Sequence, residues 1–595
     1  MIKTNRFLLL FVTACLLSVA SFAQQDKAVA KKLKGVDQYI RKAMKDWKVP
    51  GVAMVVVQNG KVVYQKGYGY RNVEKKLPVT NQTMFAIGSS SKAFTAASVC
   101  QLVDDGKLEL DKPVKKYLSD FKMYDDYVTA HMTPRDLLCH RSGLPRHDLV
   151  WYGSDYSREK MYQNLHHLEP TMGFREGWQY QNLMFMTAGY LVGQVSGNSW
   201  EKAVARRIFK PLGMNSSNFS VEKMKDAGDV ALGYGEEKEK LKVLPYRNID
   251  AVGPAGSINS NTNDMAKWLI MQLGKGKYKG KEVVSAGMLK QMHSPASIVP
   301  GNASKYSSHV SYGLGWFIST YRGQLLIDHG GNIDGFSAMV ALMPGKKTGV
   351  VILTNKNGTP ITRIIRNKVL DRLAGLEDID WSKKGLDRLA KRKASLKKAK
   401  NNKKTDQIKG TKPSRKLQHY TGKFRQAAYG DMVVALKDKQ LRVQFHSFDV
   451  PLNHYHYDVF ELASSAFKGV KIVFNSNAQG KIDKASAELQ AGVAPIVFER
   501  YKAKVTLSKA TLSLYTGEYL LNGTTVKVWA RNNQLMVSLP GQPDWELVSL
   551  KKPHTFDFKD KRLKGYQMVF AVKKGTATEV TFYQPNGVFT AKKKK

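Results

Sequence analysis

Ser89 and Lys92 are the residues whose types and spacing most directly suggest covalent chemistry. They lie three positions apart in Ser89-Ser90-Ser91-Lys92, between Ile87-Gly88 and the small apolar run 93–97. On the first turn of a helix this spacing brings both side chains to one face. Serine needs a base to take its proton, and a buried lysine near another cation can lose its own proton and act as that base. The pair therefore suits acyl transfer, with the free N–H groups of the helix start available to hold developing negative charge.

The spacing alone is weak evidence, because a lysine-rich chain produces it often. Ser89 differs from the other occurrences in its context. Gly88 precedes it, and the small apolar residues after Lys92 fit a buried central helix. The charge pattern identifies the others as solvated surface positions: Ser119/Lys122, Ser157/Lys160, Ser220/Lys223, Ser395/Lys398, Ser465/Lys468 and Ser549/Lys552.

A second candidate element is a tyrosine followed two positions later by an asparagine. We favour Tyr180-Gln181-Asn182, which follows the glycine-containing turn 173–178 and precedes the small-residue segment 186–193. This places it on a loop held by a packed helix, where functional side chains are commonly found. The remaining pairs are interpreted as surface or strand tyrosines: Tyr70/Asn72, Tyr162/Asn164 and Tyr246/Asn248.

A third element should be a strand that lines the opposite wall. Lys347-Thr348-Gly349 has a suggestive composition, but it falls in the turn of a hairpin between two strands. His329-Gly330-Gly331 closes the strand 325–328 and leads into Asn332. Glycines at that position allow a substrate backbone to approach the strand. We therefore favour His329-Gly330-Gly331.

These three elements, in this order, resemble those of the serine β-lactamase and penicillin-binding-protein-like family. The likeness is to its class C-like branch, which also holds esterases, D-aminopeptidases and DD-peptidases. The stretches 133–145, 253–257 and 264–266 resemble further parts of the family, and the resemblance covers about 36–376.

The resemblance implies a role for each residue. Ser89 would attack a carbonyl and become acylated, Lys92 would accept its proton, and Tyr180 would shuttle a proton to the leaving group and help to activate water. Asn182 would hold the substrate's amide. The backbone N–H groups of Ser89 and Asn332 would form the oxyanion hole.

His329 stands where many relatives carry lysine, and Gly330 and Gly331 follow it in the substrate-binding wall. A neutral imidazole is a weaker anchor for a carboxylate, which favours an esterase or peptidase over a β-lactamase. The absence of a Gly-x-Ser-x-Gly elbow excludes the α/β-hydrolase alternative.

The N-terminus has the pattern of a secretory signal peptide over residues 1–23. Lys3 and Arg6 precede the apolar run 7–20, and Ser21-Phe22-Ala23 offers small residues for cleavage. Val12-Thr13-Ala14-Cys15 also resembles a lipoprotein box, although the apolar run continues past Cys15. We expect a periplasmic or secreted protein, with lipidation as the alternative.

The formal net charge of +45 suggests anionic partners. Because an exported chain rarely meets nucleic acid and no nucleic-acid motif occurs, an anionic envelope surface is the partner we weigh against plain solvation. No later apolar run is long enough to span a bilayer. We expect no cofactor and no metal: His454 and His456 lack a third ligand. The pairing of Cys100 with Cys139 and the oligomeric state stay open.

The element pattern predicts an α+β catalytic domain over 24–380. A helix is expected at 36–47, a hairpin at 52–64 with an Asn59-Gly60 turn, and strands at 312–316, 325–328, 337–343 and 348–354. Strands at both ends of the region, with helices between, predict that the first and last strands share one antiparallel sheet flanked by helices.

The C-terminal part contains an internal repeat after a basic, partly helical linker at 381–416. Tyr420-Thr421-Gly422 recurs as Tyr515-Thr516-Gly517, and short alternating strands follow each copy at similar distances. The repeat predicts two small all-β, barrel-like domains at 417–502 and 503–595.

Together these features predict an exported serine hydrolase that cleaves amide or ester bonds in D-amino-acid peptides or small esters through an acyl-enzyme on Ser89. Arg146-His147-Asp148 follows a Gly-Leu-Pro turn and is a candidate for the cleft mouth. The alternatives are a β-lactamase or DD-carboxypeptidase and, from another class, a non-catalytic protein that binds the envelope or a polymer.

Overall fold

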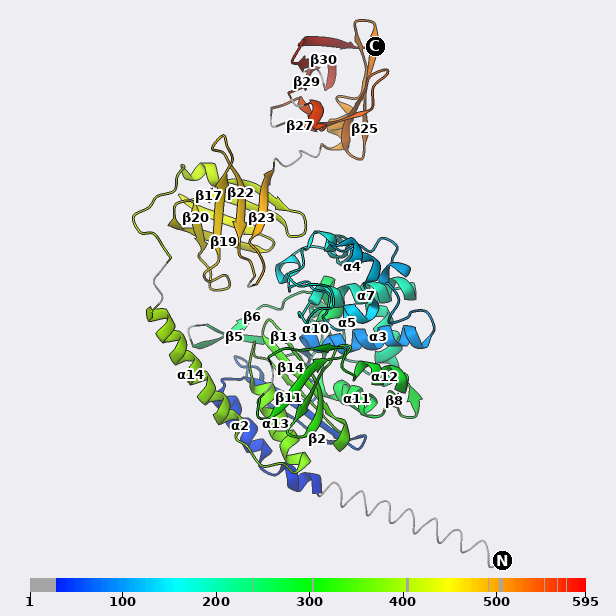
Figure 1. Cartoon of the computed structure of the whole chain (residues 1–595), viewed down its shortest axis with the longest axis vertical. Coiled ribbons are helices and arrows are strands. Elements are labelled where there is room, and N and C mark those ends of the chain that lie inside the picture. The colour runs from blue at the N-terminus through cyan, green and yellow to red at the C-terminus, as the bar shows by residue number, and fades with distance from the viewer. Residues whose placement is uncertain are drawn as a thin grey trace, which may run out of the picture. The chain divides into compact units, whose positions relative to one another are not determined.

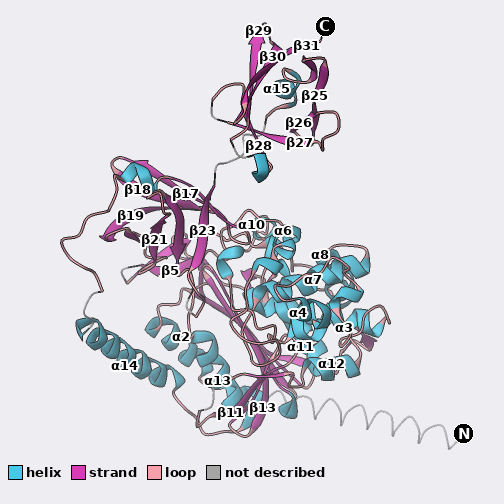
Figure 2. Cartoon of the chain, turned by 45° about the horizontal axis from the view of Figure 1, so that its top comes forward, coloured by secondary structure: helices cyan, strands magenta, loops and turns pink. Residues whose placement is uncertain are grey.

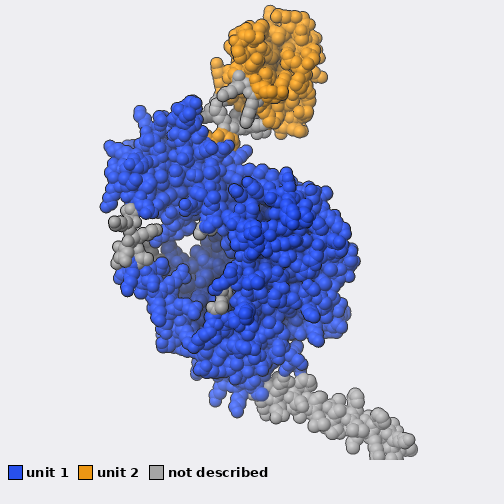
Figure 3. Space-filling model, viewed as in Figure 1, with its two compact units in different colours: residues 1–499 blue, residues 500–595 orange. Residues whose placement is uncertain are grey.

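The computed structural model describes residues 28–237, 239–301, 304–402, 406–490, 492–501, 507–550, 552–563, 565–573 and 575–594. The predicted signal peptide and Cys15 lie outside the described residues. Contacts within the chain divide it into two compact units, 1–499 and 500–595 (Figure 3). The first unit holds the catalytic-type domain and one barrel, and the second unit holds the other barrel.

A nine-stranded antiparallel sheet forms the frame of the first unit. β1 pairs with β2 on one side and with β15 on the other, with Val55 opposite Val351. The prediction that the first and last strands of this region share one sheet is therefore confirmed. The strands, in spatial order, are β10 (Ser297–Ile298), β11 (Ser307–Tyr312), β12 (Phe317–Tyr321), β13 (Gln324–Ile333), β14 (Phe336–Met343), β15 (Thr348–Thr354), β1 (Gly51–Gln58), β2 (Lys61–Asn72) and β3 (Leu77–Pro78).

Both faces of the central strands β14, β15 and β1 are buried, and β1 shows how the sequence achieves this. Val52, Met54 and Val56 pack into the core under α2 (Val36–Asp46) and α13 (Ile361–Ala374). Their neighbours Ala53, Val55 and Val57 face the opposite way, into the larger core that also contains side chains of the remaining helices. This alternation makes a continuous apolar run compatible with a strand that has two packed faces. Figure 2 shows the magenta sheet between these two groups of cyan helices.

Helices dominate the middle of this region, as predicted. The α2 helix and the β1–β2 hairpin also match their predicted positions, and Cys100 and Cys139 are buried and unpaired. The helices are α3 (Lys92–Asp104), α4 (Asp126–His131), α5 (Pro134–Leu138), α6 (Arg158–Gln163), α7 (Asn182–Ser196), α8 (Trp200–Val204), α9 (Lys210–Leu212), α10 (Val221–Lys225), α11 (Thr262–Leu273) and α12 (Ala286–Met292). Short strand pairs are β4 (Phe85–Ala86) with β7 (Asn259–Ser260), β5 (Gly233–Glu237) with β6 (Lys240–Leu244), and β8 (Lys277–Tyr278) with β9 (Lys281–Glu282).

The Lys347-Thr348-Gly349 triplet occupies the connection between β14 and β15. Pro344–Lys346 forms a 3-10 turn, and β15 begins at Thr348. Lys347 therefore ends the predicted hairpin turn, whereas Thr348 and Gly349 already pair with β14 at the start of β15. Residues 329–331 instead lie within β13, next to β14.

The basic segment after the sheet begins with one long helix, α14 (Trp381–Asn402), beside α2 and α13 (Figure 1). Its first turn is anchored, because the Trp47 indole donates to Ser382 Oγ at 3.0 Å. Leu389 and Leu396 farther along are exposed. Among the described residues, no helix is both long enough and apolar enough to cross a membrane.

Two closed eight-stranded barrels follow, which confirms the fold predicted from the repeat. Tyr420 and Tyr515, equivalent positions of the repeat, are both buried. The first barrel comprises β16 (Gly422–Gln426), β17 (Gly430–Lys437), β18 (Gln440–Phe445), β19 (Phe448–His456), β20 (Val459–Leu462), β21 (Lys471–Ser476), β22 (Ile482–Ala487) and β23 (Ile496–Tyr501). The second comprises β24 (Gly517–Leu521), β25 (Thr524–Arg531), β26 (Gln534–Ser538), β27 (Trp545–Ser549), β28 (Thr555–Phe558), β29 (Gln567–Lys573), β30 (Thr576–Gln584) and β31 (Gly587–Lys593), preceded by the short helix α15 (Lys509–Ser513).

Candidate active site

Ser89 lies in a short 3-10 helix, η1 (Gly88–Ser91), that leads directly into α3. The turn is fixed at both ends: Ile87 N donates to Ile258 O at 3.0 Å, and Ser91 Oγ donates to Gly88 O at 2.8 Å. The side chains of α3 are buried from Lys92 to Leu102, which explains the small residues there. The predicted buried helix is confirmed, but Ser89 sits one turn before it rather than on its first α-helical turn.

The Lys92 side chain ends among three oxygen atoms from three different elements. Its Nζ lies 3.1 Å from Ser89 Oγ, 2.8 Å from Asn182 Oδ1 and 2.8 Å from Ala255 O. The amide and carbonyl oxygens can only accept hydrogen bonds. A neutral amine would therefore donate its two N–H groups to them and turn its lone pair toward the Ser89 hydroxyl.

The surroundings of Lys92 favour this neutral form. Complete burial holds the pKa of Lys92 well below its usual value, and the positive charge of Arg146 lowers this pKa further, while Asp148 acts in the opposite direction. Since burial disfavours the charged form of an amine, Lys92 can accept a proton at neutral pH.

Tyr180 and Asn182 reach the same place from the loop before α7. The Gln181 amide holds this loop, because its Nε2 donates to Pro145 O at 2.5 Å and its Oε1 accepts from Leu183 N at 2.8 Å. The Tyr180 ring lies 4.8 Å from Lys92 Nζ. Burial raises the pKa of Tyr180, and a side-chain hydrogen bond with Ser89 acts in the opposite direction. A protonated phenol therefore faces the serine.

The third wall is the end of β13, which crosses close to η1. A Cβ atom on Gly331 would lie 1.8 Å from Ile87 O and 3.1 Å from Ser89 N, and one on Gly88 would lie 2.7 Å from Asn332 N. Only residues without a side chain permit this approach. The backbone nitrogens of Ser89 and Asn332 thus come from two segments in close contact, as an oxyanion hole requires.

His329 is only 2% exposed and does not belong to the residues that line the cavity beside Ser89. Its Nδ1 lies 2.6 Å from Gly330 O, so this nitrogen carries the proton, and Nε2 accepts from Tyr312 Oη at 2.9 Å. Burial lowers the pKa of His329 to about 3, with the nearby Lys92 acting in the same direction. His329 is a neutral, buried neighbour of the site, and its proposed contact with substrate stays a prediction.

A cavity of about 330 Å³ opens beside Ser89, and Asn182 and Asn332 also line it. Its polar wall adds Arg146 and Asp148, two of the three residues of the Arg146-His147-Asp148 segment considered for the cleft mouth. It also adds Tyr152 and Asp334, which the sequence analysis did not identify. The remaining lining residues are Gly88, Trp151, Ile249, Val252, Ala255, Gly256 and Ile333. Among the described residues, no group of three or more His, Cys, Asp or Glu is arranged to hold a metal ion.

The family model described as Beta-lactamase matches residues 36–374, which is more than half of the chain. The chain belongs to the Beta-lactamase family. This confirms the resemblance drawn from the three motifs, and the matched range agrees closely with the predicted one. A domain of unknown function, DUF3471, matches residues 406–500, which include the first barrel.

The proteins similar to this chain include one named as a hydrolase. An unguisins hydrolase of Aspergillus campestris is 29% identical over 417 residues, covering 67% of this chain and 76% of that protein. Protein flp of Staphylococcus aureus is 30% identical over 345 residues, which cover 56% of this chain and 65% of that protein. The structure of an octameric penicillin-binding protein homologue from Pyrococcus abyssi aligns with a TM-score of 0.52 at 22% identity, covering 87% of this chain and all of that chain. This last likeness concerns the fold alone.

His140 is a residue of this Beta-lactamase family site that sequence reasoning missed. It is fully buried against Tyr180, Phe185 and Tyr312, with ring centroids 4.3, 5.1 and 4.6 Å away. Its Nδ1 accepts from Gln181 N at 3.0 Å, so it positions the Tyr180 loop. No local pattern marks it, because its partners lie in two segments, 180–185 and around Tyr312, that are distant from it in the sequence.

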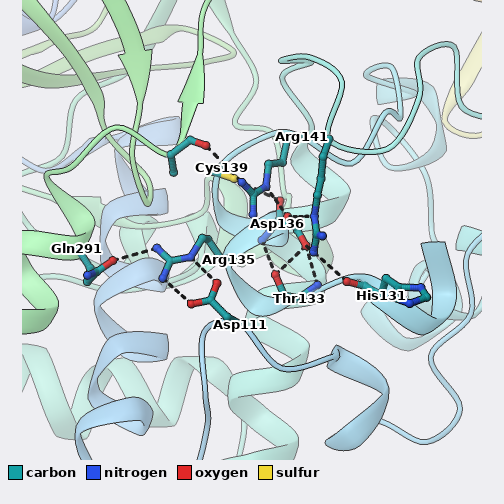
Figure 4. Close-up of polar contacts among 10 residues, drawn as sticks. Asp111, His131, Thr133, Arg135, Asp136, Cys139, Arg141 and Gln291 are labelled. Carbon is teal, nitrogen blue, oxygen red and sulfur yellow. Dashed lines mark hydrogen bonds and ion pairs between the residues drawn. The ribbon is translucent and has the colours of Figure 1, made fainter. Parts of the chain in front are cut away.

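Asp136 joins the two segments that lead to the site. Its buried carboxylate pairs with Arg141 and with Arg175 Nη2 at 2.7 Å, and it accepts from Thr133 N and Oγ1 at 2.9 and 2.7 Å. Although burial raises the pKa of Asp136, the hydrogen bonds from Arg175 and Thr133 hold it below its usual value. Figure 4 shows this carboxylate between Thr133 and Arg141, with the separate Arg135–Asp111 pair nearby. Arg141 lies in the segment that leads along the chain to Arg146, and Arg175 lies in the segment that leads to Tyr180.

We predict that Asp136→Ala destabilises the protein by about 3–5 kcal/mol, because it leaves two arginines around an empty buried position. Thermal unfolding measured by calorimetry would test this. Asp111→Ala is the control, because Asp111 is 67% exposed and its pair with Arg135 should contribute at most about 1 kcal/mol. Equal small shifts in both variants would contradict the role assigned to Asp136.

Gly331→Ala should lower the rate of ester or amide hydrolysis about 100-fold, since displacement of β13 from η1 by about 1 Å misplaces the reacting groups. Steady-state kinetics on a nitrophenyl ester, with circular dichroism to verify folding, would measure this. Gly345→Ala, in the turn between β14 and β15, is the matched control, because no atom lies within 4 Å of its added Cβ. If both variants keep the full rate, the close approach has no catalytic importance.

Proposed function

We propose that this protein is an exported serine hydrolase that cleaves amide or ester bonds through an acyl-enzyme on Ser89. The observation that carries the proposal is the buried Lys92 amine, 3.1 Å from Ser89 Oγ, with its two other positions occupied by acceptor oxygens. Membership in a hydrolase family supports the same conclusion.

In the proposed first step, the Ser89 proton moves to Lys92 Nζ while Ser89 Oγ bonds to the substrate carbonyl carbon. The carbonyl electron pair moves to its oxygen, which the N–H groups of Ser89 and Asn332 would stabilise. The bond to the leaving group then breaks, and Tyr180 relays the proton to that group. Water, activated by the same residues, hydrolyses the acyl-enzyme.

The substrates we favour are D-amino-acid peptides or small esters. The neutral, buried His329 offers no positive charge for a carboxylate, which weighs against a β-lactam substrate. A relative in Aspergillus campestris carries the name unguisins hydrolase. We therefore include an unguisin among the substrates to be screened. Arg146 in the cavity wall is the feature that favours the alternative, a β-lactamase or DD-carboxypeptidase, because its guanidinium could hold a carboxylate.

Export forms part of the proposal and is supported by the signal-peptide pattern of residues 1–23. We place the protein in the periplasm or outside the cell, with lipidation of Cys15 as the alternative. The net charge of +45 supports contact with an anionic envelope surface.

Treatment with a fluorophosphonate probe should label Ser89 covalently, and Ser89→Ala should abolish both the label and ester turnover. Mass spectrometry of the labelled peptide identifies the site. Ser90→Ala, which changes the neighbouring hydroxyl, should keep both. No label and no turnover of D-amino amides, nitrophenyl esters or a chromogenic cephalosporin would favour the non-catalytic, polymer-binding alternative.

The hydrolysis rate should rise with pH through the lowered pKa of Lys92, because below it the amine is protonated and cannot accept the serine proton. Since burial raises the pKa of Tyr180, the phenol stays protonated and the rate should not fall before about pH 10. A pH–kcat/KM profile tests both limbs.

His329→Gln serves as the control for the pH profile. Because the pKa of His329 is held at about 3, its replacement should leave the acid limb in place. An acid limb that disappears in His329→Gln would assign the titration to the imidazole instead of the lysine.

A further inference from the structure

The first barrel packs against the segment 146–153, which forms one wall of the cavity beside Ser89. Both belong to the same compact unit. The contacts come from three barrel loops, around Tyr429, Ser447 and Gln490, and each meets a residue next to the cavity wall or in it.

The first contact fixes His147, which lies between the cavity residues Arg146 and Asp148. Its Nε2 lies 3.4 Å from Glu169 O and so carries the proton, and its Nδ1 accepts from Tyr429 Oη at 2.8 Å. Both side chains are buried. The backbone of His147 has a φ of 47°, a left-handed conformation that non-glycine residues adopt only when their surroundings hold them there.

The second contact reaches the catalytic-type groups in two steps. Asp148 N donates to Gln490 Oε1 at 3.3 Å. The Asp148 carboxylate accepts from Asn182 Nδ2 at 3.0 Å, and Asn182 Oδ1 lies 2.8 Å from Lys92 Nζ. The barrel is thus joined to the amine by three successive hydrogen bonds that pass through two residues of the cavity wall, Asp148 and Asn182.

The third contact supports the far end of the segment. Ser447 N donates to Gly153 O at 2.9 Å, and the Phe448 ring stacks on Tyr152 with centroids 6.0 Å apart. Gly153 has a φ of 74°, and a Cβ there would lie 2.7 Å from Ser447 Oγ. Tyr152 in turn donates to Asp334, another cavity residue, at 2.7 Å.

The interior of the barrel offers little room for a ligand of its own. The cavity inside it is about 20 Å³ and is lined by apolar side chains, such as Phe445, Val450 and Ile472. That volume holds about one water molecule. The feature of the barrel that bears on the site is therefore the contact between its outer loops and segment 146–153.

We propose that the first barrel is a positioning part of the active site: through Tyr429, Gln490 and the Ser447-Phe448 turn, it holds segment 146–153 in the conformation that orients Asn182 toward Lys92. This inference rests on the proposed function for its kinetic consequences. The barrel residues touch neither substrate nor reacting atoms, and they act through His147 and Asp148.

Tyr429→Phe tests the inference, because it removes only the hydroxyl that His147 accepts from. In the full chain, kcat for a nitrophenyl ester should fall about 10-fold with little change in KM. The acid limb of the pH profile should move to higher pH, because a loosened wall admits water and weakens the burial that lowers the pKa of Lys92. A merely structural role would not move that limb.

Tyr519→Phe in the second barrel is the matched control, because it also removes one buried tyrosine hydroxyl, which donates to Tyr515 O at 2.7 Å. It should leave kcat and the acid limb unchanged. Unchanged kcat, unchanged acid limb and unchanged Tm in Tyr429→Phe would overturn the inference.

Hydrogen–deuterium exchange separates this inference from the proposed function. Tyr429→Phe should speed exchange in 144–153 and in 180–184, whereas Tyr519→Phe should not. If the wild type neither hydrolyses esters nor labels at Ser89 but exchange responds in this way, the proposed function fails, while the inference that the barrel positions segment 146–153 stands. If the wild type is active and exchange in both segments is unchanged in Tyr429→Phe, the inference that the barrel positions segment 146–153 is wrong.

Discussion

The buried Lys92 amine is the interaction on which the rest of this structure depends. Desolvating an amine is costly unless it becomes neutral and its N–H groups find partners. Here the partners are Ser89 from η1, Asn182 from α7 and Ala255 from η6 (Asp250–Ala255), so three elements must converge within hydrogen-bonding distance of one nitrogen atom. Each of the remaining constraints, from the glycines of β13 to the Asp136 pairs, serves to keep those elements together.

The central sheet provides the rigid side of this arrangement, and polar contacts provide the rest. β13 is fixed by its pairing with β14, and η1 can approach it because Gly88 and Gly331 have no side chains. The opposite wall comprises residues of the segment 146–153 and the loop before α7. It is held by buried ionic and amide contacts through Asp136, Gln181 and Asp148, and on its outer side by the first barrel. A wall built from polar contacts demands correct geometry for every member, because an unsatisfied buried group is costly.

Much of this arrangement could be predicted from the sequence, and the exceptions have a common cause. Ser89, Lys92, Tyr180, Asn182 and Asn332 were predicted as site residues from short motifs, and the structure brings them together. The alternating apolar residues and turn signals likewise predicted both barrels and most of the sheet, but the strand expected at 312–316 was wrong: these residues mainly connect β11 to β12. His140, Asp334 and Tyr429 could not be found in this way, because their importance arises from partners tens to hundreds of positions away. His329 was expected to contact substrate; its ring is buried and accepts a hydrogen bond from Tyr312 of β11, two strands away in the sheet, a contact that no local pattern encodes.

The three buried histidines near the site share one electrostatic property. Burial lowers the pKa of His140, His147 and His329, so all three are neutral where a lysine or arginine would carry charge. Neutral imidazoles can accept hydrogen bonds from Gln181 N, Tyr429 and Tyr312 without adding an ion to the interior. This matters for Lys92, because none of the hydrogen-bond partners of its Nζ among the described residues is a carboxylate that would stabilise the positive form. Imidazoles therefore let this site be built from polar, well-ordered groups while it stays favourable to an uncharged amine, which is the form able to take a proton from serine.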